Sequence, residues 1–307
     1  MSKDRMIAYI QMGSAMAIVG SLVTASKMTV DRIPPHLASE LRFIVAAAVL
    51  ILLLYQREGG FHFRRNRPHL SLLFWQAFFG TYLFNLCLMY GVRWTTGVES
   101  GIITSFTPAA VGLLSFLLLR ERPGWIRWVG ILFVVLGTGV IQVPGAAGGD
   151  GQGTMSLWGN LLVLAAVISE GFFITLGKKS TNHVSPLYVS TLVSLYGVLL
   201  FLPGTLEELR HFDWAAVPWE GWALILYNAL IVTVVGFLLM YAGVSRLPAS
   251  SAGLMTGLMP VSAVLLSALL LGEPVTWIHG LGILAVLTGI ALISQEKEPE
   301  PMTANKP

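Results

Sequence analysis

Two segments decide the fold, residues 101–125 (GIITSFTPAAVGLLSFLLLRERPGW) and residues 253–277 (GLMTGLMPVSAVLLSALLLGEPVTW). Adding 152 to a residue number carries the first segment onto the second and places Pro108 on Pro260. The same spacing also pairs Lys27 with Lys179, Pro34 with Pro186, Thr81 with Thr233, Gly101 with Gly253, Thr104 with Thr256, Ser115 with Ser267, Glu121 with Glu273, Gly130 with Gly282 and Gly137 with Gly289. One spacing without gaps across five apolar runs indicates an internal duplication.

The runs around these segments are long and apolar. The chain has 307 residues, of which 55% are hydrophobic and 11% charged, whereas soluble proteins are about 25% charged. A membrane-crossing helix needs about 20 apolar residues, and lipid cannot hydrogen-bond the backbone of any open structure. Ten runs qualify, at residues 6–28, 36–55, 70–90, 95–118, 125–143, 157–178, 186–204, 218–242, 247–270 and 277–295. We therefore expect an all-α integral membrane protein with ten transmembrane helices.

The duplication divides these helices into two sets of five. Residues 1–144 form the first expected repeat, residues 145–156 a Gly-rich linker, and residues 157–295 the second repeat. Residues 296–307, rich in Glu, Lys and Pro, form an expected disordered tail. Because each repeat has an odd number of spans, the second copy enters the membrane upside down, which gives an inverted repeat.

The distribution of Lys and Arg predicts the orientation. With the N-terminus inside, fourteen of these residues fall on the cytoplasmic side: Lys3, Arg5, Arg57, Arg64, Arg65, Arg67, Arg120, Arg122, Arg127, Lys178, Lys179, Arg246, Lys297 and Lys306. Five fall on the other side: Lys27, Arg32, Arg42, Arg93 and Arg210. The excess of positive charge inside favours cytoplasmic N- and C-termini.

Several classes of function lack their sequence signals. No phosphate-binding G-x-x-x-x-G-K-[ST] segment occurs, and no G-x-S-x-G nucleophile elbow is present. The six histidines lack metal-ligand spacing, and the single cysteine, Cys87, has no partner. The basic run 64–67 lies beside a span and fits topology and anionic lipid better than nucleic acid. We expect no enzyme activity, no metal or cofactor and no nucleic-acid partner, but a monomer in lipid that handles a small-molecule substrate.

Glu170 lies near the middle of the sixth expected helix, where an ionisable side chain faces protein or a water-filled cavity. One hypothesis is that its carboxylate is the counter-ion of a substrate ammonium group or a proton-coupling group. The alternative is a structural glutamate satisfied by a neighbouring helix. Both remain open at the level of sequence.

The third expected helix carries Trp75, Phe78, Tyr82, Asn85 and Met89 at spacings of three and four, which places them on one helical face. This face mixes aromatic surface with hydrogen-bonding groups, as suits a ligand with a ring and a polar head. The alternative is an ordinary packing stripe. Of these residues, Phe78, Tyr82 and Asn85 are our candidates for substrate binding.

The fourth expected helix offers Ser100, Thr104 and Pro108, and the ninth offers Thr256 and Pro260 at repeat-related places. A proline inside a helix removes one backbone hydrogen bond and bends the helix or frees a carbonyl. We predict substrate contacts for the hydroxyl residues and a gating role for the two prolines. The alternative is a pair of kinks required only for packing.

Polar side chains on the first and eighth expected helices give further candidates, of which Ser14 and Tyr227 are included as substrate contacts. Hydrogen bonds between helices are the alternative for these two and for Ser21, Thr24, Asn228 and Tyr241. Glu121 and Glu273 are expected to cap helices or to join loops. Close helix packing is expected at Gly20, Gly101, Gly137, Gly253 and Gly289.

Together these residues resemble the drug/metabolite transporter superfamily, whose members carry two EamA-type five-helix repeats. The resemblance lies in residues 20–27, Leu41-Arg42-Phe43, Pro108, Glu121 with Trp125 and Gly130, and Glu273 with Trp277 and Gly282. Across the whole chain the likeness is greatest to YddG-type bacterial exporters of aromatic amino acids. It implies a multi-pass protein of the bacterial inner membrane. It also implies a midplane cavity lined by helices one, three, four, six, eight and nine, with helices five and ten peripheral.

The expected function is a secondary transporter that exports amino acids, preferably aromatic ones, from the cytoplasm by alternating access. The transporter class follows from the inverted repeat and the polar groups at membrane depth. Export of other small metabolites or cationic drugs is an alternative, and an intramembrane enzyme or lipid-handling protein is an alternative of a different class. Energy coupling and resting conformation remain open.

Overall fold

A computed structural model describes residues 3–28, 33–61, 63–95, 100, 103–121, 124–142, 153–272 and 275–295, and within these ranges it contains helices and no strands. The first half of the chain forms α1 (Lys3–Met28), α2 (Pro35–Glu58), α3 (Phe63–Asn66), η1 (Arg67–His69), α4 (Leu70–Ala77), η2 (Phe78–Leu83), α5 (Phe84–Trp94), α7 (Thr107–Leu119) and α8 (Trp125–Gln142). The second half forms α9 (Gly153–Thr181), α10 (Pro186–Leu209), η4 (Trp214–Ala216), α11 (Trp219–Tyr227), η5 (Asn228–Val235), α12 (Gly236–Arg246), α13 (Ala249–Met255), α14 (Leu258–Leu271) and α15 (Trp277–Gln295).

The helices have the length and composition of an all-helical membrane protein. Within the described ranges six segments are long and apolar enough to cross a bilayer, Pro35–Glu58, Arg67–Gly91, Leu157–Thr181, Pro186–Leu209, Trp219–Arg246 and Ala249–Leu270. Three shorter apolar helices accompany them, Thr107–Leu119, Trp125–Ile141 and Trp277–Leu292. The count of ten spans and the cytoplasmic termini stay predictions.

The first helix of the second half reaches into the expected linker. Helix α9 begins at Gly153, inside the expected linker 145–156. Residues 143–152 and the expected tail 296–307 lie outside the described residues. The linker signal came from glycines, and Gly153 is compatible with a helical start because the first helical N–H groups need no intrahelical partner.

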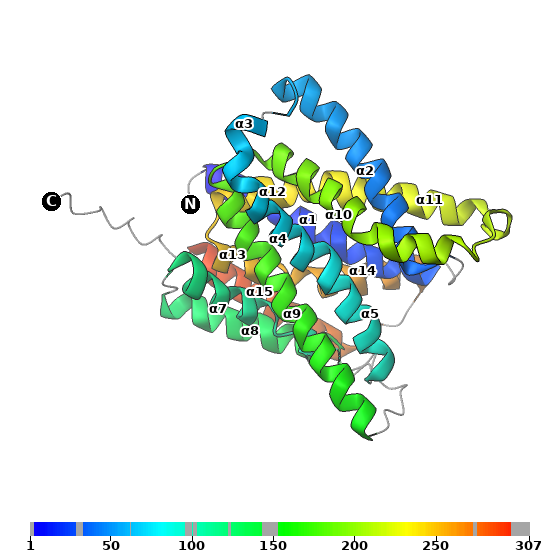
Figure 1. The fold of residues 1–307 in the computed structure, drawn as a ribbon. Coiled ribbons are helices and arrows are strands. Elements are labelled where there is room, and N and C mark those ends of the chain that lie inside the picture. The colour runs from blue at the N-terminus through cyan, green and yellow to red at the C-terminus, as the bar shows by residue number, and fades with distance from the viewer. Residues whose placement is uncertain are drawn as a thin grey trace.

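Helices α2 and α10 pack against each other along one side of the bundle (Figure 1). The ring of Phe43 stacks on Phe201 with 5.9 Å between centroids. A carboxylate from each helix lies at the N-terminus of the other. Ser185 Oγ, before α10, donates to Glu58 Oε1 of α2 at 2.7 Å, and Leu37 N of α2 donates to Glu208 Oε2 of α10 at 2.8 Å. Negative charge at a helix N-terminus is stabilising.

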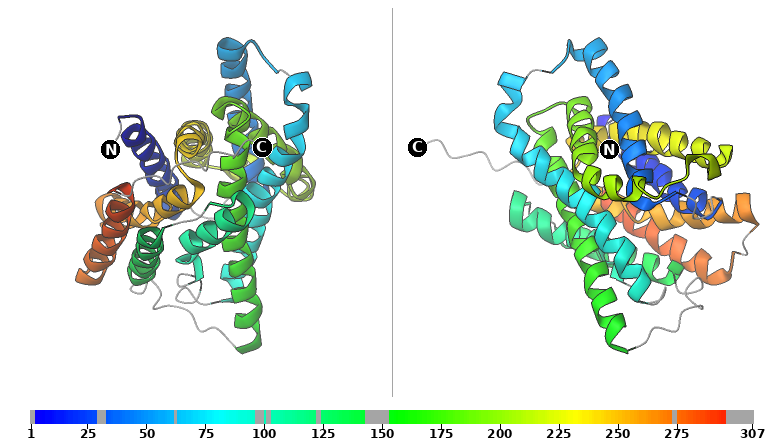
Figure 2. Two further views of the ribbon diagram at one scale, coloured as in Figure 1. Left: turned by 90° about the vertical axis from the view of Figure 1, so that its left-hand side faces the viewer. Right: turned by 45° about the vertical axis from the view of Figure 1, so that its right-hand side comes forward.

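Helices α8 and α15 lie side by side at another edge of the bundle (Figures 1 and 2). A Cβ atom added to Gly137 would lie 2.7 Å from Gly282 O, and one added to Gly289 would lie 2.7 Å from Gly130 O. At the repeat spacing Gly137 corresponds to Gly289, and Gly130 corresponds to Gly282. The two contacts are therefore repeat-related, and the same close backbone approach occurs twice in this interface. The expected packing role is confirmed for Gly137 and Gly289.

Other expected packing and capping residues also have identifiable contacts. A Cβ on Gly20 would lie 2.4 Å from Met259 O, and one on Gly253 would lie 2.5 Å from Val111 Cβ, so both glycines permit close packing. Glu121 caps α13, because its carboxylate accepts from the backbone N–H groups at residues 249 and 250 at 2.8 and 3.1 Å. Gly101 and Glu273 lie outside the described residues.

Two π-helical segments, η2 and η5, interrupt α-helical runs at repeat-related places. Thr81 and Thr233 are a repeat pair within them, and their hydroxyls donate to Ala77 O at 2.6 Å and to Asn228 O at 2.9 Å. A π segment bonds residue i to residue i+5 and often marks a functional site. It also changes which side chains share a face downstream, which matters for the cavity.

Candidate functional site

The fourth and ninth expected helices are broken at repeat-related turns. Helix α7 begins at Thr107 with Pro108 in its first turn, and α14 begins at Leu258 with Pro260 in its first turn. Since proline has no N–H, each leaves the carbonyl four residues earlier without its helical donor. Thr107 Oγ1 donates to Thr104 O at 2.9 Å in the first repeat. In the second repeat Met259 N donates to Thr256 O, also at 2.9 Å.

A cavity of about 310 Å³ lies beside these two turns, between α5, α7, α8, α9 and α14. Its apolar wall is formed by Phe84, Leu88, Pro108, Met259, Pro260 and Ala263. Its polar wall is formed by Ser100, Thr104, Thr107, Thr138, Glu170 and Thr256. A few placed polar groups within an apolar wall are typical of small-molecule sites.

Among the described residues that line the cavity, Glu170 supplies the only carboxyl group, and none is Lys, Arg or His. Thr107 Oγ1 lies 3.3 Å from Glu170 Oε2 and joins α7 to α9. Thr138 Oγ1 contacts Ser105 O at 3.4 Å and joins α8 to the turn before α7. The described part of the cavity wall therefore combines one carboxyl group with several hydroxyls.

Several residues predicted from sequence come together in this cavity. They are Glu170, Ser100, Thr104, Thr256, Pro108 and Pro260. They come from segments far apart in the chain, and the paired turns before Pro108 and Pro260 bring them together. Their roles in binding and gating remain predictions.

Three predicted residues of the third expected helix lie elsewhere. Phe78 and Tyr82 belong to an aromatic group, with Tyr82 5.3 Å from the Phe201 ring of α10. Asn85 Nδ2 donates to the backbone carbonyl of Thr81. The predicted face assumed an uninterrupted α-helix, and η2 breaks that assumption. Beyond η2, α5 contributes Phe84 and Leu88 to the cavity instead.

Ser14 and Tyr227 do not line the cavity either. Ser14 is exposed on α1. Tyr227 OH and Ser21 Oγ lie 2.5 Å apart and join α11 to α1. For Tyr227 the geometry is the helix-to-helix hydrogen bond that was the alternative to substrate contact.

The set of lining helices also differs from the one that the resemblance implies. The fifth expected helix, α8, contributes Thr138, whereas the described residues of helices one and eight contribute none. Thr138 was missed because the resemblance places the fifth expected helix at the periphery, away from the cavity. Thr107 was missed although it adjoins Pro108, and this position beside a helix break is a signal that could have found it.

Comparison with known proteins fits this architecture. The sequence profile of the EamA-like transporter family matches residues 6–143 and again residues 157–295. The chain belongs to this family. It is therefore a membrane transporter with two EamA repeats, embedded by multiple helices.

Transporters from Bacillus subtilis (strain 168) are similar over nearly the whole chain. The uncharacterized transporter YetK is 45% identical over 303 residues, which cover 98% of this chain and 91% of YetK. The uncharacterized transporter YyaM is 23% identical over 289 residues, 93% of each chain. A solved crystal structure aligns with a TM-score of 0.77 at 18% identity, over 93% of this chain and 96% of that chain. This last similarity supports the fold alone.

Proposed function

We propose that this EamA transporter exports amino acids, aromatic ones first among them, across the bacterial cytoplasmic membrane by alternating access. The observation that carries the proposal is the carboxylate of Glu170, held by Thr107 in a cavity between two repeat-related helix breaks. A protonated substrate amine would pair with this carboxylate. Sites between inverted repeats, formed by broken helices, are common in secondary transporters.

The rest of the cavity supplies partners for the other parts of an aromatic amino acid. The hydroxyls of Ser100 and Thr104 and the positive end of α7 would receive the substrate carboxylate. The apolar side chains of Phe84, Leu88 and Met259 would contact its ring. The volume of about 310 Å³ is within the range of small-molecule pockets.

A second candidate function is export of amines without a carboxylate, such as cationic drugs or amine metabolites. It is favoured by the absence of Lys, Arg and His from the cavity lining within the described residues. An amine of this kind would still need Glu170. The two candidates therefore differ in whether the substrate carboxylate matters.

The test is flux of labelled tryptophan and phenylalanine through purified protein in liposomes. Unlabelled competitors should include tryptamine, which lacks the carboxylate, and indolepropionate, which lacks the amine. Saturable flux that is blocked by aromatic amino acids and weakly by tryptamine supports the first candidate. Stronger block by tryptamine supports the second, and absence of flux with labelled tryptophan and phenylalanine contradicts the first.

Glu170→Gln keeps the shape of the side chain and removes its charge. A hydrogen bond to a charged group contributes about 1.5–3 kcal/mol, so the half-saturating concentration should rise about 10- to 100-fold. Glu220→Gln, an exposed acid on α11, is the matched control and should transport normally. Normal transport by Glu170→Gln would show that its carboxylate is structural.

A further inference from the structure

A second carboxyl group is buried away from the cavity, in the interface of α2 and α10. Glu40 is 3% exposed and lies on the same face of α2 as His36 and Phe43. Both of these neighbours contact Phe201 of α10, at 6.1 and 5.9 Å between ring centroids. Glu40 therefore faces α10, and neither helix contributes a residue to the cavity lining.

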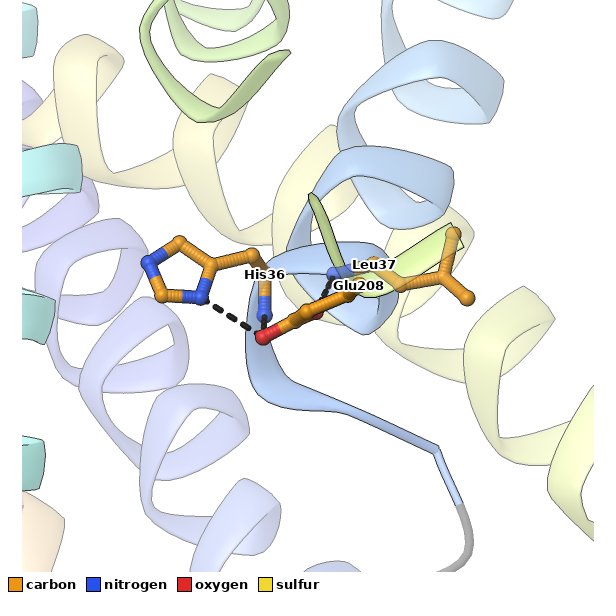
Figure 3. A network of polar contacts seen from close by, with 3 residues as sticks. All are labelled: His36, Leu37 and Glu208. Carbon is orange, nitrogen blue, oxygen red and sulfur yellow. Dashed lines mark hydrogen bonds and ion pairs between the residues drawn. The ribbon is translucent and has the colours of Figure 1, made fainter. Parts of the chain in front are cut away.

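The end of this interface is formed by the hydrogen-bonded side chains of His36 and Glu208 (Figure 3). His36 Nδ1 lies 2.8 Å from Glu208 Oε1, and the other carboxylate oxygen accepts from Leu37 N at 2.8 Å. The side chains of His36 and Glu208 are 16% and 20% exposed, so the pair touches both solvent and the buried interface. Glu40 is one helical turn further in than His36, on the same helix face.

Among the described residues, Glu40 Oε2 is buried and has no hydrogen-bond partner. Thr205, one turn before Glu208 on α10, is 2% exposed and its hydroxyl also lacks a described partner. A buried carboxylate without a partner is strongly unfavourable, whereas a protonated carboxyl group is tolerated. The interface in this conformation therefore accommodates Glu40 as a neutral acid.

The charged and titratable groups near this interface leave Glu40 without a counter-ion in the described part of the chain. On α2, Arg42 lies over the ring of Phe43, 4.5 Å from its centroid, and two residues along a helix do not face each other. On α10, exposed Glu207 pairs with Arg210 at 3.2 Å, and Glu208 is held by His36. On α11, which also packs against α2, Glu220 is exposed and Tyr227 bonds to Ser21.

We propose that Glu40 is a proton-binding site, separate from the substrate cavity, through which export is coupled to the proton gradient. The proposal rests on the proposed transport function. A proton from water outside the bundle enters beside the His36–Glu208 pair and binds a carboxylate oxygen of Glu40. One proton is transferred, and no other bond is made or broken.

A contact path joins this site to the cavity. Phe201 of α10 stacks edge-on against Tyr82 of η2, with 5.3 Å between ring centroids. The π segment η2 continues directly into α5, which carries Phe84 and Leu88 in the cavity wall. Neutral Glu40 permits the closed α2–α10 interface, whereas ionised Glu40 favours a conformation in which water reaches it. Proton binding thus biases the conformational equilibrium that the substrate also biases.

The test separates substrate exchange from gradient-driven accumulation in proteoliposomes that contain the full chain. Wild-type protein should accumulate labelled substrate against its gradient when a pH gradient is applied. Glu40→Gln should keep exchange of labelled for unlabelled substrate and lose this accumulation, while Glu220→Gln should keep both. Wild-type flux that ignores the pH gradient, or Glu40→Gln that still accumulates substrate, overturns the proposal while the transport function stands.

A second measurement needs no substrate and no flux. Infrared spectra of the purified protein, recorded over a pH series, report the carbonyl stretch of protonated carboxyl groups. Glu40→Gln should lose one such band that Glu220→Gln retains, and Glu40→Asp should keep a band at a shifted position even if glutamine fails to fold. Identical carboxyl bands in wild type and in folded Glu40→Gln overturn the proposal, whatever the flux experiment shows.

Discussion

In the first repeat Thr107 stands directly before the proline of the broken helix, and in the second repeat Met259 stands there. The other two polar groups joined to this turn differ in the same way, because the repeat counterpart of Thr138 is Ile290 and that of Glu170 is Ile18. The helix breaks, the π segments and the glycine contacts occur in both repeats. The duplicated frame thus repeats the helix break, whereas Thr107, Thr138 and Glu170, which meet at the cavity, each occur in one repeat only.

The two ends of the bundle differ as well. Gln76 Nε2 donates to Tyr241 OH at 2.9 Å and its Oε1 accepts from Ser180 Oγ at 2.9 Å, so α4, α9 and α12 are joined by fully buried groups. The repeat counterpart of Gln76 is Asn228, whose Oδ1 has no partner among the described residues. The counterpart of Tyr241 is Met89, which has no hydrogen-bond donor. One end is therefore joined by a buried polar network, and the repeat-related described residues at the other end do not form its counterpart.

The largest effect is expected at the contact that occurs twice. Gly137→Leu and Gly289→Leu each force a side chain into a backbone only 2.7 Å from the new Cβ. Each should lower the free energy of unfolding by about 3 kcal/mol, the upper part of the usual range for overpacking. Thermal unfolding in detergent measures this. Gly280→Leu is the control, because nothing lies within 4 Å of its Cβ position.

Equal losses at Gly137 and Gly289 would support an interface that is symmetric in energy as well as in geometry. A loss at one position only would show that one copy of the contact carries the packing of α8 against α15. A loss at Gly280 of the same size would mean that the method responds to leucine on a lipid-facing surface. Each result has a distinct meaning because the three sites lie on the same two helices.

The second prediction compares the two ends of the bundle. Gln76→Leu leaves Tyr241 and Ser180 with unpaired buried groups and should destabilise the protein by about 2 kcal/mol, within the range for such losses. Asn228→Leu removes an oxygen that has no described partner and should change stability little. Thermal unfolding of both variants measures the difference. If Asn228→Leu lowers the stability more than Gln76→Leu does, the hydrogen bonds of Gln76 do not account for the difference between the two ends.

The sequence was sufficient to predict the duplicated frame, because helix period, proline and glycine positions repeat at one spacing. It also marked Glu170, Pro108 and Pro260 as separate candidates, since each is unusual at membrane depth, and the structure places all three at one cavity. These signals are local to one residue or recur in the second copy. They therefore do not depend on how the helices are rotated about their axes.

The remaining lining residues depend on helix rotation, which the sequence does not report. Tyr82 and Asn85 were predicted on the assumption of 3.6 residues per turn, and the π segment η2 invalidates that count from Phe78 onward. Glu40 was overlooked because it sits close to a helix start, where an acidic residue is ordinary. Its burial follows only from the packing of α10 against α2.

The third prediction concerns the polar groups that occur in one repeat only. Thr107→Val keeps the side-chain shape and removes the hydroxyl that contacts Glu170 and Thr104 O. The loss should be about 1 kcal/mol for one hydrogen bond, or about fivefold in the half-saturating substrate concentration. Thr288→Val is the matched control, because its exposed hydroxyl bonds only to its own helix. Unchanged half-saturation in Thr107→Val would mean that Glu170 is positioned without it.

The smallest effect on stability is expected at the two prolines. Because Pro108 and Pro260 are repeat-related, substituting each in turn compares the two repeats directly. Pro108→Ala and Pro260→Ala restore a backbone donor, so each should change stability by less than about 1 kcal/mol. The restored donor would compete with Thr107 Oγ1 for Thr104 O in the first repeat and with Met259 N for Thr256 O in the second.

Both variants should slow flux, because a straighter helix bends less readily. Thr107 also holds Glu170, so Pro108→Ala should in addition weaken substrate binding, whereas Pro260→Ala should leave it unchanged. Initial rates measured over a series of substrate concentrations separate the two effects. If both variants are stable and their flux is normal, the prolines serve helix packing only, and the predicted gating role is wrong.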